Sequence, residues 1–420
     1  MAHATTDDSG PILTADGIPL KVSLQRSLRR RKLRAVGLVL PPLLFLLFLF
    51  IFPIGSLLTI SVDDTLINTV LPRTFEKFGS WDQENLPGED LYKAMYEDLT
   101  HADRLKIGKS SIRMNYQKPG WRSLIKSAAR QFRKIKGPPY KEAMIKIDKR
   151  WGDKEFWQSL GAMKDPYTLG YYLNAVDLKY NGKKQVVAQP ENRRVYRLLW
   201  WRTLLISTIV TVGCLLMAYP VSHLLATLPL RYSNLLMICV LMPFWTSLLV
   251  RIVAWMVMLQ QNGVVNDVLV WSGLLADNHR LPMMYNFNGT VIVMIQILLP
   301  FMILPLYSVM KTIPPSYMKA AQNLGATPSL AFFKVYLPQT VPGIGAGVIL
   351  VFIVAIGYYI TPELVGGRDG QMIGNFIARH MQKTLNWGLA SAMGTLLLVA
   401  ILILYYVYDK IVGIDNMKMG

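Results

Sequence analysis

The sequence has few of the residues from which catalytic and metal sites are usually built. Two of its 420 residues are cysteines, Cys214 and Cys239, and both lie inside apolar runs, which excludes a disulfide framework and a CxxC metal site. The five histidines are scattered without metal-ligand spacing, and no nucleophile elbow or other catalytic motif occurs. We therefore expect a chain that is not itself an enzyme and that holds no cofactor or metal of its own.

Charged residues are also scarce, at 17% of the chain, while hydrophobic residues make up 52%. Soluble domains are rarely so apolar, and here the apolar residues are gathered into long runs from which charge is nearly absent. The formal net charge of +19 is therefore carried by the segments between those runs. This pattern is typical of a membrane protein with several spans and basic flanks, and it argues against a nucleic-acid partner.

Six runs reach the roughly 20 apolar residues needed to cross the hydrocarbon layer. They cover about 35–62, 199–226, 235–259, 290–310, 344–364 and 392–412. No small-residue cleavage site follows the first run, so we expect it to be a retained span and not a removed signal peptide. The predicted fold is an all-α polytopic membrane protein with six transmembrane helices and membrane lipid around them.

The orientation follows from a basic cluster, RSLRRRKLR at Arg26–Arg34, which abuts the first span. Lys and Arg close to a span end are retained in the cytoplasm. Six crossings then place both termini in the cytoplasm, together with the loop between the fourth and fifth spans. The predicted organisation is a cytoplasmic basic tail 1–34, a first span 35–62, an extracytoplasmic insert 63–198, a transmembrane core 199–412 with a loop at 312–338, and a cytoplasmic tail 413–420.

The insert carries 26 Lys and Arg against 17 Asp and Glu over 61–198, yet long loops translocate largely regardless of charge. Helical patterns cover Leu91–Leu105, Trp121–Lys136 and Lys141–Leu160, so we expect a small and mostly helical domain. The apolar stripe of the second pattern either lies on an anionic membrane surface or forms the core of the insert, and the core is the simpler reading.

The loop after the fourth span is more patterned than a connection requires. Its sequence, YMKAAQNLGATPSLAFFKVYLP, spans Tyr317–Pro338. Prolines just before it suit a helix start, Gly325 suits a turn through positive φ, and Thr327 suits the cap of a second helix that Pro338 ends. Small alanines keep the first helix thin, so that another backbone can approach closely. The pattern predicts a helix–turn–helix projection made to dock in a partner.

This stretch resembles the signature loop of the membrane permease subunits of type I ABC importers, which reads Glu-Ala-Ala, three residues, Gly, nine residues, Ile, any residue, Leu-Pro. The chain matches that spacing with Lys319-Ala320-Ala321, Gly325, Val335 and Leu337-Pro338. In the family the loop is the coupling helix, which docks in a cleft of the ATP-hydrolysing subunit. The resemblance therefore implies ATPase coupling by Lys319, Ala320, Ala321, Leu324, Gly325 and Pro338. The departure is Lys319, where the family usually carries an acid.

Further stretches look like the spermidine/putrescine branch of these permeases. They are Leu241–Trp255, Asn262–Leu269, Gly357–Gly367, Met372–Met381 and Ala218–Ala226. The resemblance implies import of a small solute, with a polyamine as the leading cargo. Another solute, such as an amino-acid derivative, an opine or a phosphonate, stays open, as does a membrane receptor or scaffold acting through the insert.

Four residues are candidates for the translocation path. Arg251 lies inside the third span, where a lone charge either lines a path or anchors one helix to another by bonding backbone carbonyls. Tyr358 and Tyr359 lie in the fifth span in a region that the resemblance places near the path, and with Trp245 they could hold a cation against aromatic faces. The alternative is that these aromatics belong to the core or to the membrane interface.

The resemblance also implies partners and a location. We expect a second permease subunit, two ATPase subunits that bind ATP and Mg²⁺, and an extracytoplasmic solute-binding protein, all at a bacterial inner (plasma) membrane.

Overall fold

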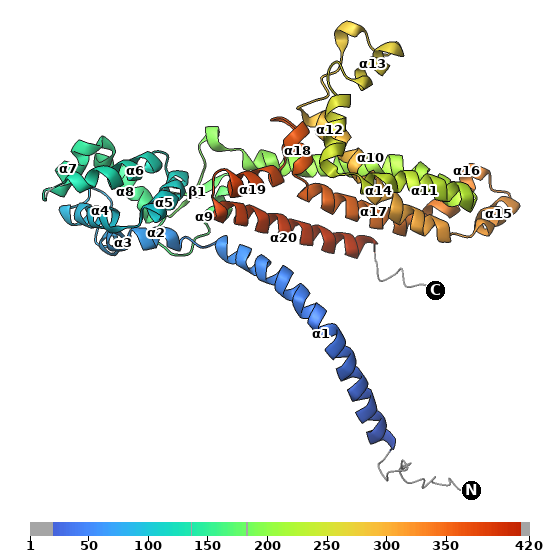
Figure 1. Cartoon of the computed structure of the whole chain (residues 1–420), viewed down its shortest axis with the longest axis horizontal. Helices are drawn as coiled ribbons and strands as arrows, with labels where there is room; N and C mark the ends of the chain where they lie inside the picture. The colour runs from blue at the N-terminus through green and yellow to red at the C-terminus, as the bar shows by residue number, and fades with distance from the viewer. Residues whose placement is uncertain (1–19, 136, 182–183, 413–420) are drawn as a thin grey trace. The chain divides into compact units, whose positions relative to one another are not determined.

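The structure is a computed structural model that describes residues 20–135, 137–181 and 184–412. The chain divides into two compact units, residues 1–59 and residues 60–420. Residues 1–19 of the predicted N-terminal tail and the whole predicted C-terminal tail, 413–420, lie outside the described residues. Figure 1 shows the helices with their labels.

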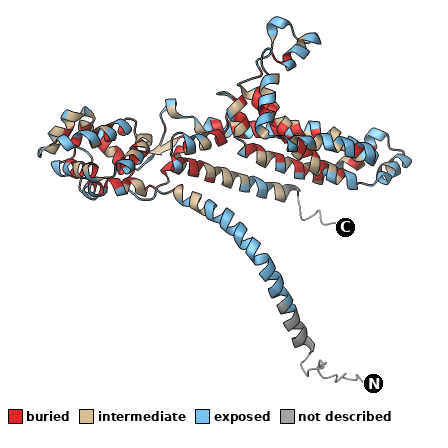
Figure 2. Ribbon diagram, viewed as in Figure 1, coloured by how far each residue is buried: buried red, intermediate tan, exposed pale blue. Residues whose placement is uncertain are grey.

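The first unit is dominated by the long helix α1 (Leu20–Ile60), which takes in the basic cluster as well as the first predicted span. The helix is thus already formed before the span begins. Pro41, Pro42 and Pro53 lie inside it. Its apolar side chains are exposed on all sides over the stretch 35–54 (Figure 2), as expected for a helix surrounded by lipid.

The second unit begins with the insert, residues 61–195, which is mostly helical. Its elements are α2 (Thr65–Val70), α3 (Pro72–Phe78), α4 (Glu89–His101), α5 (Arg104–Gln117), α6 (Trp121–Gln131), η1 (Phe132–Lys134), α7 (Tyr140–Ile147), η2 (Lys149–Gly152), α8 (Lys154–Gly161), α9 (Gly170–Asn174), β1 (Leu178–Tyr180), β2 (Val186–Ala188) and η3 (Glu191–Arg193). The two strands pair antiparallel, with Lys179 opposite Val187. The periodicity gave no sign of α2, α3 or this hairpin, because elements of three to seven residues are too short to show a period.

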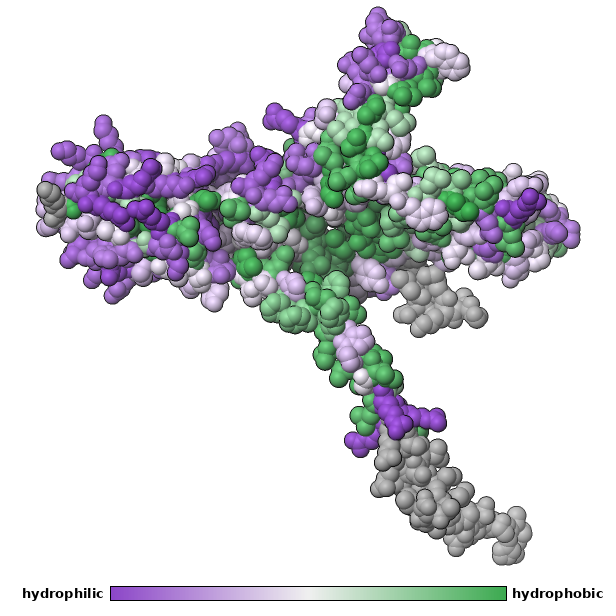
Figure 3. All heavy atoms as spheres, viewed as in Figure 1, coloured by the Kyte–Doolittle hydropathy of each residue, from purple (hydrophilic) through white to green (hydrophobic). Residues whose placement is uncertain are grey.

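The insert has an aromatic core of its own. Trp121, Trp151 and Trp157 are fully buried, and the Tyr92 hydroxyl and the Trp157 indole both donate to the Trp151 carbonyl, at 2.6 Å and 2.9 Å. The apolar stripe of α6 points into this core, and Figure 3 shows hydrophilic residues over the insert surface. The core reading of the stripe is therefore confirmed, and α6 has no apolar face left for a membrane surface.

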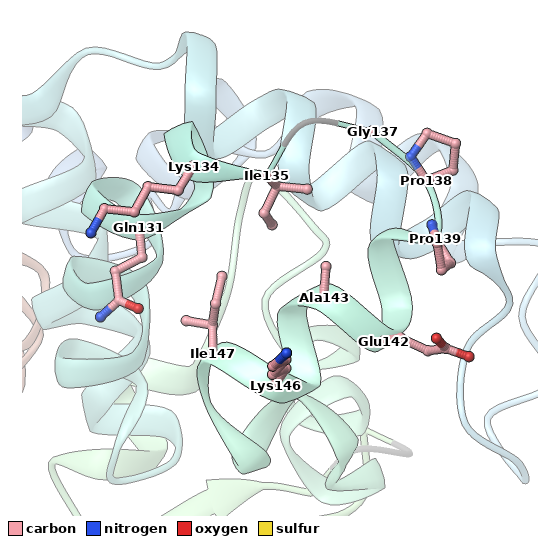
Figure 4. Close-up of a pocket in the computed structure, with 10 residues that line it drawn as sticks. All are labelled: Gln131, Lys134, Ile135, Gly137, Pro138, Pro139, Glu142, Ala143, Lys146 and Ile147. Atoms are coloured by element: carbon pink, nitrogen blue, oxygen red, sulfur yellow. The ribbon is translucent and has the colours of Figure 1, made fainter.

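A hollow of about 820 Å³ lies between η1 and α7 in the insert. Figure 4 shows Ile135, Ala143 and Ile147 turned toward it, with Lys134 and Lys146 beside them.

The remaining elements form the transmembrane core, residues 196–412. They are α10 (Tyr196–Thr227), α11 (Leu230–Trp245), α12 (Leu248–Met258), α13 (Val264–Trp271), η4 (Asp277–His279), α14 (Phe287–Thr312), α15 (Pro315–Asn323), α16 (Pro328–Ala331), η5 (Phe332–Tyr336), α17 (Leu337–Gly357), α18 (Ile360–Val365), α19 (Ile373–Gln382) and α20 (Trp387–Val412). By length and composition, five helices of the described chain could cross a membrane, or six if one bent pair counts as a single span.

Glycines let α10, α14 and α17 pack closely side by side (Figure 1). A Cβ on Gly347 would lie 2.6 Å from the Met302 sulfur, and one on Gly343 would lie 3.2 Å from the Pro305 carbonyl oxygen. These helices bury most of the large apolar side chains of the core. They form the rigid base from which the loop after α14 projects.

Two predicted spans differ from what the structure shows. The third span is broken between α11 and α12, which meet at 99° across Thr246 and Ser247. The fifth predicted span corresponds to α17, which ends at Gly357. Tyr358 and Tyr359 therefore lie in a break before α18 and not inside a span. Hydropathy could not reveal either break, because the residues on both sides are apolar.

The insert is seated on the transmembrane core through α9 and α5. Gly388, at the start of α20, faces the Tyr171 ring so closely that a Cβ there would lie 2.4 Å from it. His380 of α19 contacts the Tyr196 hydroxyl at 2.9 Å and the Tyr116 ring edge-on at 6.2 Å. Burial, with a contribution from Arg379, lowers the pKa of His380 to about 4. The histidine is therefore neutral at physiological pH, and the contact is a neutral hydrogen-bonded one.

Candidate functional site

The candidate site is the projection formed by residues 315–336, which we call the knuckle. Helix α15 begins at Pro315 and ends in a Schellman motif, in which Gly325 N–H donates to the Gln322 carbonyl and Ala326 N–H to the Ala321 carbonyl. Gly325 has φ +89°, a value that glycine adopts without strain. The Thr327 hydroxyl then accepts from Leu330 N–H. The predicted helix, glycine turn and cap are confirmed.

The second half of the knuckle departs from the prediction. After the single turn of α16 the backbone widens into the π-helix η5 and passes without interruption into α17. The prediction that Pro338 ends this helix is wrong, because the chain remains helical through Pro338, which is the second residue of α17. The knuckle is thus joined directly to a membrane span.

The outer face of the knuckle is apolar and uncovered. Leu324 is 89% exposed and Phe333 is 63% exposed, and Tyr317 and Leu330 are exposed beside them. Lys319 is also exposed and makes no ion pair with any described residue. Exposed apolar side chains gathered in one loop mark an interaction surface.

The inner face of the knuckle is held by an aromatic cluster. Phe332 stacks on Tyr336 with ring centroids 5.6 Å apart, and both meet the His223 ring of α10 edge-on, at 5.7 Å and 5.0 Å. Phe332 also contacts the Tyr219 ring at 6.2 Å, and the Tyr219 hydroxyl lies 3.3 Å from the Thr340 hydroxyl of α17. The knuckle is therefore attached to α10 and α17 together.

The structure places the six predicted coupling residues as follows. Five lie on the knuckle itself, with Leu324 and Gly325 at its tip, and the sixth, Pro338, lies where the knuckle joins α17. The sequence signature did not identify Phe332, Tyr336 or His223. The sequence signal that could have identified two of them is their spacing: Phe332 and Tyr336 are four residues apart and so lie on one face of a helix.

The path candidates do not form one cluster. Arg251 lies on α12, which packs on α18, the helix that follows Tyr358 and Tyr359. Trp245 ends α11 and is 75% exposed, and no ring contact joins it to Tyr358 or Tyr359 among the described residues. Tyr359 is also exposed.

A carboxylate adjoins the tyrosines. Glu363 of α18 is exposed, and its N–H donates to the Tyr359 carbonyl at 3.0 Å. The Asn375 amide of α19 donates to the Glu363 carboxylate at 3.0 Å and to the Tyr359 carbonyl at 2.8 Å. No role for Glu363 was predicted from the sequence. The structure shows the Glu363 carboxylate held by the Asn375 amide, which also donates to the Tyr359 backbone carbonyl.

A membrane-spanning helical core, with an apolar knuckle tied to two spans, defines a permease subunit of the type I ABC importer class. The family described as "Binding-protein-dependent transport system inner membrane component" matches residues 216–413. The spermidine/putrescine transport system permease protein PotB of Haemophilus influenzae is 36% identical over 226 residues, which are 54% of this chain and 78% of that protein. PotB of Escherichia coli K12 is 33% identical over 50% of this chain and 76% of that protein.

The chain belongs to this family of inner-membrane permease components, and within it to the branch that includes those relatives. It is therefore a multi-pass transport subunit and not an enzyme. Among solved structures, a bacterial alginate ABC transporter in complex with an alginate pentasaccharide-bound periplasmic protein is 19% identical over 54% of this chain and 80% of that chain, with a TM-score of 0.43.

Proposed function

We propose that this chain is one of two permease subunits that form the path of an ATP-driven importer for a polyamine or a similar small organic cation. The PotB relatives, named for spermidine and putrescine transport, support the cargo. The exposed carboxylate of Glu363 and the exposed ring of Tyr359, four residues earlier in the chain, support it too, because an ammonium group is attracted both by a carboxylate and by an aromatic face. In this proposal Arg251, Trp245 and Tyr358 also line the path.

The partners in this proposal are a second permease, two ATPase subunits and a solute-binding protein. The knuckle faces the cytoplasm with both termini, and the insert faces the opposite side. ATP and Mg²⁺ are bound by the ATPase subunits. When nucleotide draws those subunits together, the docked knuckle pulls on α10 and α17 through Phe332 and Tyr336, and the spans alternate between inward-open and outward-open.

The observation that carries the proposal is the exposed apolar tip at Leu324, set on an anchored base. Burying a leucine in a partner cleft contributes about 1.5–3 kcal/mol, so Leu324→Asp should weaken ATPase binding at least about tenfold. Leu105→Asp is the matched control, because Leu105 of α5 is similarly exposed but lies on the insert. Retention of the ATPase subunits by purified variants measures the effect. An equal loss of ATPase retention in both variants, or no loss in either, would contradict a docking role for Leu324.

The cargo is tested by ATP-dependent uptake of labelled spermidine into proteoliposomes that contain the whole complex. Glu363→Gln keeps the size of the side chain but removes its charge, so we expect the KM for spermidine to rise about tenfold with little change in ATPase binding. Uptake of a neutral or anionic solute in preference to spermidine would reject the polyamine assignment and leave the permease assignment standing.

A further inference from the structure

A pocket of about 370 Å³ lies at the base of the insert, within the second unit. Its lining includes Ile60, where the first span ends, and Trp387, where the last span begins. A site bordered by the ends of two spans lies at the level where the chain leaves the bilayer. Trp387 is half exposed there, and tryptophan is enriched at membrane–water interfaces. The occupant of the pocket is therefore to be sought at a lipid–water boundary.

The floor of the pocket holds a buried ion pair with one donor left over. Arg113 of α5 is 7% exposed and Asp64 is 2% exposed, and their two contacts measure 3.0 Å from Nε and 2.8 Å from Nη2. Nε also donates to the Tyr171 hydroxyl at 2.8 Å. The Nη1 atom of Arg113 has no hydrogen-bond partner. A buried guanidinium donor without an acceptor costs free energy, so the site favours an oxygen-bearing ligand.

The rim of the pocket carries one charge of each sign. Lys109 of α5 and Asp63 are both exposed, and neither is in an ion pair with a described residue. One Asp63 carboxylate oxygen accepts from Thr65 N–H at 2.9 Å, which fixes the orientation of that side chain. Together with Arg113 and Asp64, the four charges sum to zero. A neutral sum made of separated charges fits a zwitterion better than a net anion.

We propose that this pocket binds the headgroup of a zwitterionic phospholipid of the phosphoethanolamine type, with its phosphate toward Lys109 and Arg113 and its ammonium toward Asp63. The phosphate supplies the acceptor that Nη1 lacks, and three ammonium hydrogens suit a carboxylate. Apolar side chains complete the wall beside the charged groups, among them Ile60, Leu66 and Ile112. The bound lipid secures the base of the insert to the membrane in which the spans lie. The proposal does not depend on which cargo the chain transports.

The test is native mass spectrometry on the full-length chain, purified in detergent and titrated with single lipids. We expect one phosphatidylethanolamine to bind at least about tenfold more tightly than phosphatidylcholine, whose quaternary amine cannot donate to Asp63. Asp63→Ala should abolish that preference, and Lys109→Ala should weaken both lipids about tenfold. Arg113 is left intact, because its loss would strand the buried Asp64 charge.

Lys106→Ala is the matched control, since Lys106 is an exposed lysine on the same helix and does not line the pocket. It should leave both affinities unchanged. Phosphatidylglycerol binding as tightly as phosphatidylethanolamine would overturn the zwitterion assignment. Displacement of the lipid by inorganic phosphate at equal concentration would show a free-anion site instead of a lipid site. If the wild type and the three variants bound lipid equally, the bound lipid would be non-specific annular lipid and the proposed site would be rejected.

Discussion

Gly325 offers the sharpest test of the knuckle, because its role depends on its backbone and not on side-chain packing. Its φ is +89°, and a Cβ built at this position meets no atom within 4 Å. A substitution therefore costs only the backbone strain. An L-residue in the left-handed region costs roughly 1–2 kcal/mol, and a β-branched residue more. For Gly325→Val we take about 2 kcal/mol, which is about a 30-fold shift away from the native turn.

That shift should affect the tip of the knuckle and not its base, because different contacts hold the two. The Schellman motif that ends α15 needs the positive φ of Gly325, whereas the aromatic anchor at Phe332 and Tyr336 does not. Gly325→Val should therefore leave the base of the knuckle attached to α10 while its tip loses a fixed shape. ATP hydrolysis by the assembled complex should continue, and uptake per ATP hydrolysed should fall about tenfold or more.

The matched control is Gly325→Asn, because asparagine tolerates positive φ better than other non-glycine residues. It should retain most of the wild-type coupling. The assay measures ATPase activity and uptake on the same proteoliposomes, with subunit content checked on gels. Wild-type coupling in the valine variant, or equal loss in both variants, would refute the reasoning from backbone strain.

Three further predictions concern the joint between the insert and the transmembrane core, each checked by thermal unfolding of the detergent-solubilised chain. Gly388→Ala places a Cβ 2.4 Å from the Tyr171 ring and should destabilise the joint by about 1–3 kcal/mol; an unchanged midpoint would mean that the ring moves freely. Asp64→Ala strands the buried charge of Arg113 and should cost about 3–5 kcal/mol, part of which a second change, Arg113→Met, should restore. His380 should make stability depend on pH: its pKa is about 4 when folded against 6.5 ordinarily, so the unfolded chain takes up the proton first as pH falls. Stability is then full above pH 6.5 and declines toward pH 4 by about 3 kcal/mol, a decline that His380→Gln should remove.

Local rules predicted the first half of the knuckle correctly. Proline at the start of α15, glycine at its end and threonine as the next cap each act over three or four residues, so the sequence contains the whole cause. The same rules failed at Pro338. There the outcome depended on the π-helix η5, whose aromatic side chains are held by α10, more than a hundred residues earlier in the chain.

Hydropathy identified the spans but not their breaks. The interruptions before Leu248 and after Gly357 lie within apolar stretches, and their geometry is set by packing of α12 against α18 and of α18 against α19. The pairing of Glu363 with Asn375 is of the same kind, because the connection 366–372 separates α18 from α19 and only the fold brings the two side chains together.

The sequence alone determined that this chain crosses a membrane, which segments are apolar enough to do so, and where a helix–turn–helix projects between two of them. Each of these depends on composition or on neighbours a few residues apart. The tertiary structure alone decided that the insert has its own aromatic core, that Arg113 and Asp64 pair beneath it, and that two aromatic rings tie the projection to α10 and α17. These features need contacts between residues far apart in the chain, and such contacts exist only once the helices have packed.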